Sequence, residues 1–240
     1  MNRHQIFFLA LMFTGSVPVA AQSTDTDTGS MFSHNSRARI PEGKTLRGEK
    51  ARPIIDEFGA CIVNRFRMRA LRAVSTLPES FAGARAISDV SVDECVEQGE
   101  MKMNEAVIRA SLYRALYVAD YRRIAPQVRP IIIDFTQGQV GLTGQAKMGV
   151  TLRQFADCVV RSNAAAVRTL VLAPSGTPSE SAAMGAVGPY LGQCLTPGSR
   201  MEFTKSILFG LLSEVLYRDS VPGTKLADVV ELPSAAVPAR

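Results

Sequence analysis

Four cysteines are the residues whose type and spacing most clearly indicate chemistry. They are Cys61, Cys95, Cys158 and Cys194, so 34 residues separate the first two and 36 separate the last two. An even number of cysteines in an exported chain indicates disulfides. The chain has no C-x-x-C motif and no neighbouring cysteine that would resolve a reactive thiol, which argues against redox chemistry.

A repeated phrase favours one pairing of these cysteines. FGACIV at 58–63 and FADCVV at 155–160 match at an offset of 97, and each contains the first cysteine of its pair. If each copy is one folding unit, the disulfides join Cys61 to Cys95 and Cys158 to Cys194. Each is then worth about 3.5–4 kcal/mol by the chain-entropy estimate. Disulfides between the copies and free thiols are the alternatives.

The shortage of histidine excludes several enzyme classes. The chain has two histidines, His4 and His34, and both precede the repeated region. Ser-His-Asp and Cys-His catalysis and histidine-ligated zinc are therefore not expected in the repeats. No dinucleotide fingerprint, P-loop, H-E-x-x-H or G-x-S-x-G motif is present, and we expect no cofactor.

Two kinds of catalytic chemistry need no histidine. Lys205 and Ser206 are adjacent, so on a helix they point in different directions and do not form a dyad. Acidic residues gather around Cys95, and carboxylate pairs can cleave glycosides. The acidic residues are Asp93, Glu94, Glu97 and Glu100. The second copy lacks these acidic residues, which favours their interpretation as a solvated turn near a helix N-terminus. An envelope hydrolase that uses a carboxylate pair is the alternative function.

Five residues are candidates for contact with a partner. Arg65, Arg69 and Arg72 would form one basic edge on a helix, and the second copy has Ser162, Ala166 and Thr169 in their places. Tyr117 and Tyr217 occupy equivalent positions at an offset of 100. The simpler interpretations are a solvated helix face for the arginines and half-buried rings with paired hydroxyls for the tyrosines.

The elements that carry these residues are predicted to be helices. Apolar residues at helical spacing predict a first helix A over 55–77 and a second over 152–170, where Thr151 and Gln154 form a capping box. A connector rich in Pro, Ser, Gly and Ala follows each, over 75–89 and 175–189.

A second helix, B, then follows in each copy. It is expected to be capped at Gly99 in copy one and at Ser199, with Glu202, in copy two. Small residues in the middle of these helices, Ala110 and Gly210, indicate close helix packing.

The predicted fold class is therefore all-α, a tandem duplication of a disulfide-tied module in which helix A, a connector and helix B occur twice. An extended or strand-like linker separates the copies. The predicted boundaries are a signal peptide at 1–21, a disordered polar arm at 22–50, repeat 1 at 51–129, the linker at 130–150, repeat 2 at 151–232 and a flexible tail at 233–240.

Export is predicted from the first residues. Arg3 precedes an apolar run over 6–13, and Val19 and Ala21 precede a cleavage position before Gln22, the layout of a secretory signal peptide. The run is too short to span a bilayer, so no stable membrane span is expected after cleavage. The net charge of +5, or +4 without Arg3, is spread along the chain and argues against nucleic-acid binding.

The second copy resembles a known group of proteins. Cys158 in one helix, followed by Cys194, Leu195, Pro197 and Gly198 before an amphipathic helix, resembles the small helical periplasmic immunity proteins that neutralise type VI secretion effectors. The resemblance covers about 60 residues, and copy one departs from it because its CVEQG lacks the proline. The likeness is one of disulfide-and-helix layout, and no family is assigned from it.

The expected function is thus that of a periplasmic or secreted, non-enzymatic binding module with a protein partner in the cell envelope. A composition of 46% hydrophobic and 20% charged residues is typical of a folded protein.

Overall fold

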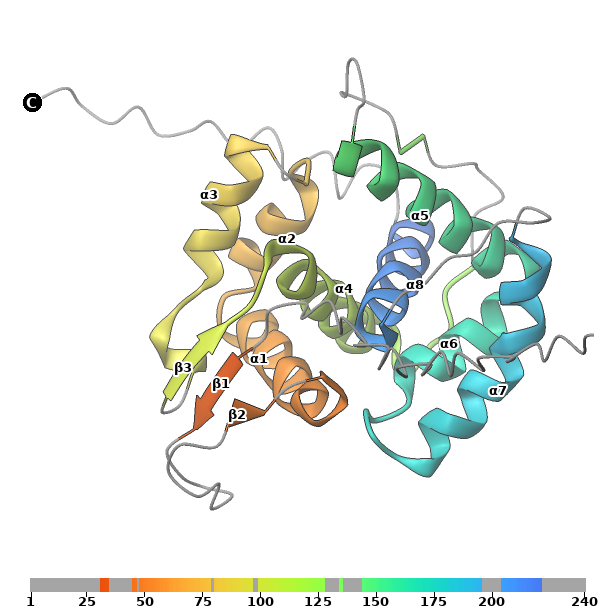
Figure 1. Cartoon of the computed structure of the whole chain (residues 1–240), viewed down its shortest axis with the longest axis horizontal. Coiled ribbons are helices and arrows are strands. Elements are labelled where there is room, and N and C mark those ends of the chain that lie inside the picture. Colours follow the sequence, from red (N-terminus) through yellow and green to blue (C-terminus); the bar gives the residue numbers. More distant parts are fainter. Residues whose placement is uncertain are drawn as a thin grey trace, which may run out of the picture.

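The computed structural model describes residues 31–34, 45–46, 48–78, 80–96, 99–127, 134–135, 144–195 and 204–221. Helices dominate this part of the chain (Figure 1). The α-helices are α1 (Arg52–Arg65), α2 (Arg67–Ser75), α3 (Phe81–Val90), α4 (Glu105–Tyr121), α5 (Gly144–Ser162), α6 (Ala164–Leu172), α7 (Pro178–Gln193) and α8 (Lys205–Ser220). The remaining elements are β1 (Met31–His34), β2 (Thr45–Leu46), β3 (Gly99–Lys102) and the 3-10 turns η1 (Gly48–Ala51) and η2 (Asp93–Cys95). The all-α prediction is confirmed at this level.

Each predicted helix A is broken in the structure into two helices. The first break is at Phe66, between α1 and α2, with φ −132° and ψ 41°. The second is at Asn163, between α5 and α6, with φ −158° and ψ 81°. The two breaks are 97 residues apart, the offset of the repeated phrase. Neither break contains a proline, and the apolar residues keep their helical spacing through it. The breaks are therefore not visible in the hydrophobic periodicity of the sequence.

The connectors are also helical, contrary to the prediction. Ser80 caps α3 by accepting a hydrogen bond from the Gly83 amide, and Thr177 caps α7 by accepting one from the Glu180 amide. The serines, threonines and prolines that suggested loops are therefore helix start signals.

Two other predicted helix starts were wrong. α4 begins at Glu105 with Asn104 as its N-cap, whereas Gly99 lies in strand β3. α5 begins at Gly144, so Thr151 lies inside the helix and its hydroxyl donates to the Lys147 carbonyl. Thr204 caps α8 in copy two, and the predicted Ser199–Glu202 capping box lies outside the described residues.

The segments predicted to lack regular structure are partly ordered. Residues 31–34 and 45–46, within the predicted arm, form strands in a small antiparallel sheet whose order is β2-β1-β3. Pairing with residues 99–102, distant in sequence, supplies the backbone partners that local patterns do not show. In the predicted linker 130–150, residues 144–150 belong to α5. The signal peptide and the tail lie outside the described residues.

Helices α4 and α8 cross at the centre of the described fold, with α1–α3 on one side and α5–α7 on the other (Figure 1). At their crossing a Cβ atom added to Gly210 would lie 2.4 Å from the Cβ of Ala110. These two residues are equivalent in the repeat, so the expected close packing joins the two copies at matching positions. Within each copy α1 packs on α4 and α5 packs on α8.

The disulfides form within each copy, as predicted. Cys61 is bonded to Cys95 with a Cα–Cα distance of 5.7 Å, and Cys158 is bonded to Cys194 with a distance of 5.8 Å. Both distances are in the usual range for disulfides. Each bond ties the long first helix of a copy to the chain that follows its third helix.

Candidate functional site

The two tyrosines proposed as partner contacts are buried, which corrects their assignment to a surface. Tyr117 is 0% exposed and Tyr217 is 2% exposed. The Tyr217 hydroxyl donates to Asp120 Oδ2 at 3.2 Å, and its ring lies 6.1 Å from that of Tyr113. Burial, reinforced by the Asp120 carboxylate, raises the pKa of Tyr217. Tyr217 therefore joins α8 to α4, and the ring of Tyr117 lies 5.3 Å from that of Tyr121 on the same helix.

The three arginines are exposed, but they do not line one helix. Arg65 ends α1, whereas Arg69 and Arg72 belong to α2 beyond the break. The guanidinium groups of Arg65 and Arg69 lie 5.8 and 5.0 Å from the centroid of the Phe66 ring. They also donate to the carbonyls of Glu94 and Asp89. Arg65 therefore contacts the 3-10 turn η2 and Arg69 contacts the end of helix α3, both within the same copy.

The acidic cluster around Cys95 is described only in part. Glu94 is exposed, whereas the side chains of Asp93, Glu97 and Glu100 lie outside the described residues. Among the described side chains, no group of three or more His, Cys, Asp or Glu residues could hold a metal ion. No described helix is long and apolar enough to cross a membrane.

The candidate site is a groove between α1 and α4, walled on one side by the turn between α6 and α7. Its cavity volume is about 830 Å³. Small and apolar side chains make up most of its surface. They are Pro53, Ala60, Val63, Ser111, Ala115, Val118, Ala119, Ile124, Leu172 and Pro174. Ile124 is 76% exposed at one end, although isoleucine is a residue that folding normally buries.

The two helices run in the same direction along the groove. Ile55 packs against Val107 near their starts, and a Cβ atom added to Gly59 would lie 2.6 Å from the Ser111 carbonyl oxygen one turn later. The helices are therefore closest at Gly59. The small side chains beyond this point, such as Ala60 and Ala119, leave the space between them open.

Arg114 fixes the wall of the groove. It forms an ion pair with Asp56 across the floor, and its Nε donates to the Val171 carbonyl at 3.0 Å. Nη2 donates to the Ala173 carbonyl and Nη1 to the Ser175 hydroxyl. These carbonyls are at the C-terminus of α6, where a cation is favourable. The α6–α7 turn is therefore held against α4 by a side chain each of whose three nitrogens already donates to an acceptor.

A buried ion pair holds the same turn from its other side. Arg52, at the start of α1, is bonded to Glu180 in α7, and its guanidinium lies 4.3 Å from the centroid of the Phe209 ring. Burial alone would raise the pKa of the Glu180 carboxyl. Hydrogen bonds from Arg52 and from the Gly176 amide outweigh burial and hold the pKa below its usual value.

The charges of the groove are separated along its length. Asp56 and Glu57 lie at the end formed by the start of α1, and Arg122 and Arg123 lie at the end that follows α4. Asp120, near the basic end, is bonded to Arg67 through both carboxylate oxygens at 2.7 and 2.8 Å. Asp56 is paired with Arg114, so among the described residues the groove charges without an ion pair are Glu57 at one end and Arg122 and Arg123 at the other.

The second copy carries different residues at the positions that form the groove. The exposed residues Ala60 and Ala119 correspond to Asp157 and Asp219, which are both buried. Asn64 corresponds to Arg161, whose Nε donates to Asp157 Oδ2 at 2.8 Å. In the same way Ser111 and Ala115 correspond to Leu211 and Val215. The same space in the second copy is therefore occupied by larger side chains and an ion pair.

Two buried carboxylates of the second copy, Asp157 and Asp219, lie close to one arginine. Asp157 is hydrogen-bonded to Arg161, and the charge of Asp219 also acts on this arginine.

The groove residues were not identified from the sequence, because alanines and a serine carry no chemical signal. The signal that would have found them is the comparison of the copies, in which small residues replace large or charged ones along one face.

Comparison of the chain with protein-family models, with curated proteins and with solved structures finds no match.

Proposed function

We propose that this chain is an exported, non-enzymatic interaction module of the cell envelope that binds a protein partner in the groove between α1 and α4. The observation that carries the proposal is the pair of small, exposed side chains Ala60 and Ala119 in the groove, at positions where the second copy has the larger, buried Asp157 and Asp219. Two disulfides and a predicted signal peptide support an oxidising compartment.

We also propose that the two copies arose by tandem duplication. Helices α1–α3 correspond to α5–α7 at an offset of 97, including both breaks, both caps at Ser80 and Thr177, and the first cysteine of each disulfide. α4 corresponds to α8 at an offset of 100. After duplication one copy can keep a packed face while the other opens it for binding.

A protein partner suits the groove better than a small polar ligand. Small-molecule sites place a few free polar groups at the centre of a pocket. Here the central cation, Arg114, donates to Asp56 and to the carbonyls of Val171 and Ala173. The floor is apolar and the charges lie at the rim, the distribution found in protein interfaces.

The test fills the groove with the residues of the second copy. The triple variant Ala60→Asp, Asn64→Arg and Ala119→Asp recreates side chains that the fold accommodates between α5 and α8. A photo-crosslinking amino acid at Glu57, which is exposed on the rim, reports the partner in the native envelope fraction. We expect a specific crosslinked product with the parent protein and its loss in the filled variant.

The matched control makes the same changes on an exposed face of α3. Ala82→Asp, Ala84→Asp and Ser88→Arg alter charge and size equally, and all three positions are exposed. This control should retain the product, and circular dichroism should give the same helix content for all three proteins. Equal crosslinking by the filled variant and the parent would refute the groove as the binding site.

A further inference from the structure

We infer that the segment bound in the groove is an amphipathic helix, antiparallel to α1 and α4, with an acidic N-terminal end and a basic C-terminal end. This inference rests on the proposed function and specifies the partner's chemistry. Three observations carry it. They are the length and direction of the groove, the helical walls whose backbone groups are already hydrogen-bonded, and the separation of charge between the two ends.

The groove has the length and direction of a helix. Its α1 wall runs from Pro53 to Asn64, twelve residues, or about 17 Å at the rise of an α-helix. Ala60, Ala115 and Ala119 allow another helix to approach closely, as small residues do at other helix crossings. About three helical turns with a narrow apolar stripe would cover this floor.

The groove walls favour a helical rather than an extended segment. The lining residues of α1 and α4 belong to helices, whose amide and carbonyl groups are paired within the helix. An extended segment would therefore find no strand edge there and would leave its own amides unpaired over an apolar floor. A helix satisfies its backbone internally and needs only side-chain contacts.

The separated charges set the direction of the bound helix. Arg122 and Arg123 at the end that follows α4 favour acidic residues, and Glu57 at the other end favours basic ones. Isolated helices are stabilised by acidic residues in the first turn and basic residues in the last turn. The matching orientation places the N-terminus of the bound helix at Arg122 and Arg123, antiparallel to the two parallel walls.

The experiment measures binding of two synthetic helices by fluorescence anisotropy. Both have twelve residues, the same Leu/Ala stripe and a lactam bridge on the opposite side that keeps them helical. One has two Glu at its N-terminus and two Lys at its C-terminus, and the other has these charges exchanged. We expect the first to bind the protein about five- to tenfold more tightly at low ionic strength, and the difference to shrink in high salt.

Reversing the rim should invert this preference. The variant Glu57→Lys, Arg122→Glu and Arg123→Glu should prefer the second peptide, whereas the groove-filled variant should bind neither. A control with the same charge changes at exposed positions that do not line the groove, Glu94→Lys, Arg72→Glu and Arg85→Glu, should keep the parent preference.

Two results would overturn the inference. Equal affinity of the parent protein for both peptides would refute the orientation, and failure to bind either would refute a helix as the bound segment. If the photo-crosslinked envelope product is still obtained while both peptides fail, the groove binds a partner of another shape. If the crosslinked product is also missing, the proposed function itself fails.

Discussion

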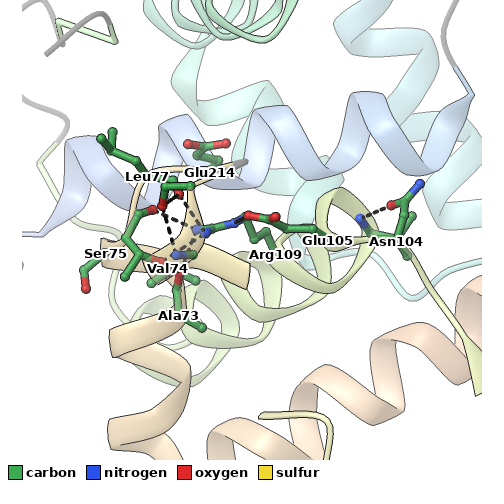
Figure 2. Close-up of polar contacts among 12 residues, drawn as sticks. Ala73, Val74, Ser75, Leu77, Asn104, Glu105, Arg109 and Glu214 are labelled. Carbon is green, nitrogen blue, oxygen red and sulfur yellow. Dashed lines mark hydrogen bonds and ion pairs between the residues drawn. The ribbon is translucent and has the colours of Figure 1, made fainter. Parts of the chain in front are cut away.

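Replacing Arg109 with alanine should destabilise the fold by about 3 kcal/mol. Arg109 belongs to α4 and is 3% exposed, and its guanidinium lies at the C-terminus of α2 (Figure 2). Its Nη1 donates to the carbonyls of Ala73 and Thr76 at 2.6 and 3.0 Å, and its Nε is bonded to Glu105 at 2.7 Å. It thus joins α4 to the end of α2 through a buried cation.

The loss of unfolding free energy depends on which carbonyl oxygens still have a hydrogen-bond donor once Arg109 is removed. The Ala73 carbonyl still accepts from the Thr76 hydroxyl, whereas no second donor to the Thr76 carbonyl is found among the described contacts. One buried acceptor without a partner costs about 1–3 kcal/mol, and the lost cation at a helix C-terminus adds up to about 2 kcal/mol. We expect about 3 kcal/mol in total, or a fall in Tm of about 6–12 °C for a chain of this size.

Thermal unfolding followed by circular dichroism under non-reducing conditions measures this loss. Arg109→Lys keeps the charge but not the fork of donors, so its Tm should lie between those of the parent and the alanine variant. Arg72→Ala is the matched control, because Arg72 is exposed on α2 and its loss should change stability by less than about 0.5 kcal/mol. Equal Tm values for Arg109→Ala and Arg72→Ala would refute the capping role.

Two further predictions concern the contacts between the copies. In the folded protein the pKa of Glu180 lies below its usual value of about 4.3, so on acidification the unfolded chain binds the proton first. The stability that Glu180 contributes is therefore complete above about pH 4.3 and is lost as the pH falls through the folded pKa. Glu180→Gln should therefore be less stable at pH 7 and should lose less stability on acidification, which urea unfolding at several pH values would show; an unchanged acid dependence would contradict this. Gly210→Ala should cost about 1–3 kcal/mol, since its Cβ would lie 2.4 Å from that of Ala110. The double variant Ala110→Gly and Gly210→Ala should recover most of this in thermal unfolding, and no recovery would show that the clash is not the cause.

The parts of the fold that the sequence predicted are those with a repeated signal. The disulfides could be paired because two nearly equal separations recur, and the helices could be expected because apolar residues recur at helical spacing. The breaks at Phe66 and Asn163 could not, because no proline or glycine marks them and the stripe continues past them. Helices α3 and α7 were missed because Ser80 and Thr177 suit a loop and a helix cap equally well.

The burial of the tyrosines and the position of the groove could not be predicted from the sequence for a different reason. Tyr117 and Tyr217 looked like contacts because they are aromatic and equivalent, but α4 and α8 are covered on most sides and bury them. Reading one helix at a time does not reveal how many neighbours surround it. The groove, in turn, is made by missing side-chain volume at Ala60 and Ala119, which becomes visible only when their counterparts are known to be buried.

An ion pair between the first and last helices has its polarity reversed between the two halves of the fold. In the first copy Asp56 on α1 pairs with Arg114 on α4. At the equivalent positions of the second copy, the cation is on the first helix and the anion is on the last, as Arg153 on α5 pairs with Glu214 on α8 at 2.9 Å. If α1 packed against α8, two carboxylates would meet, and if α5 packed against α4, two guanidinium groups would meet. Like charges at part-buried positions disfavour those arrangements, so the reversal directs each first helix to the partner within its own copy. Two modules with nearly the same apolar stripe can then fold side by side without exchanging helices, and one of them is free to open its α1–α4 face.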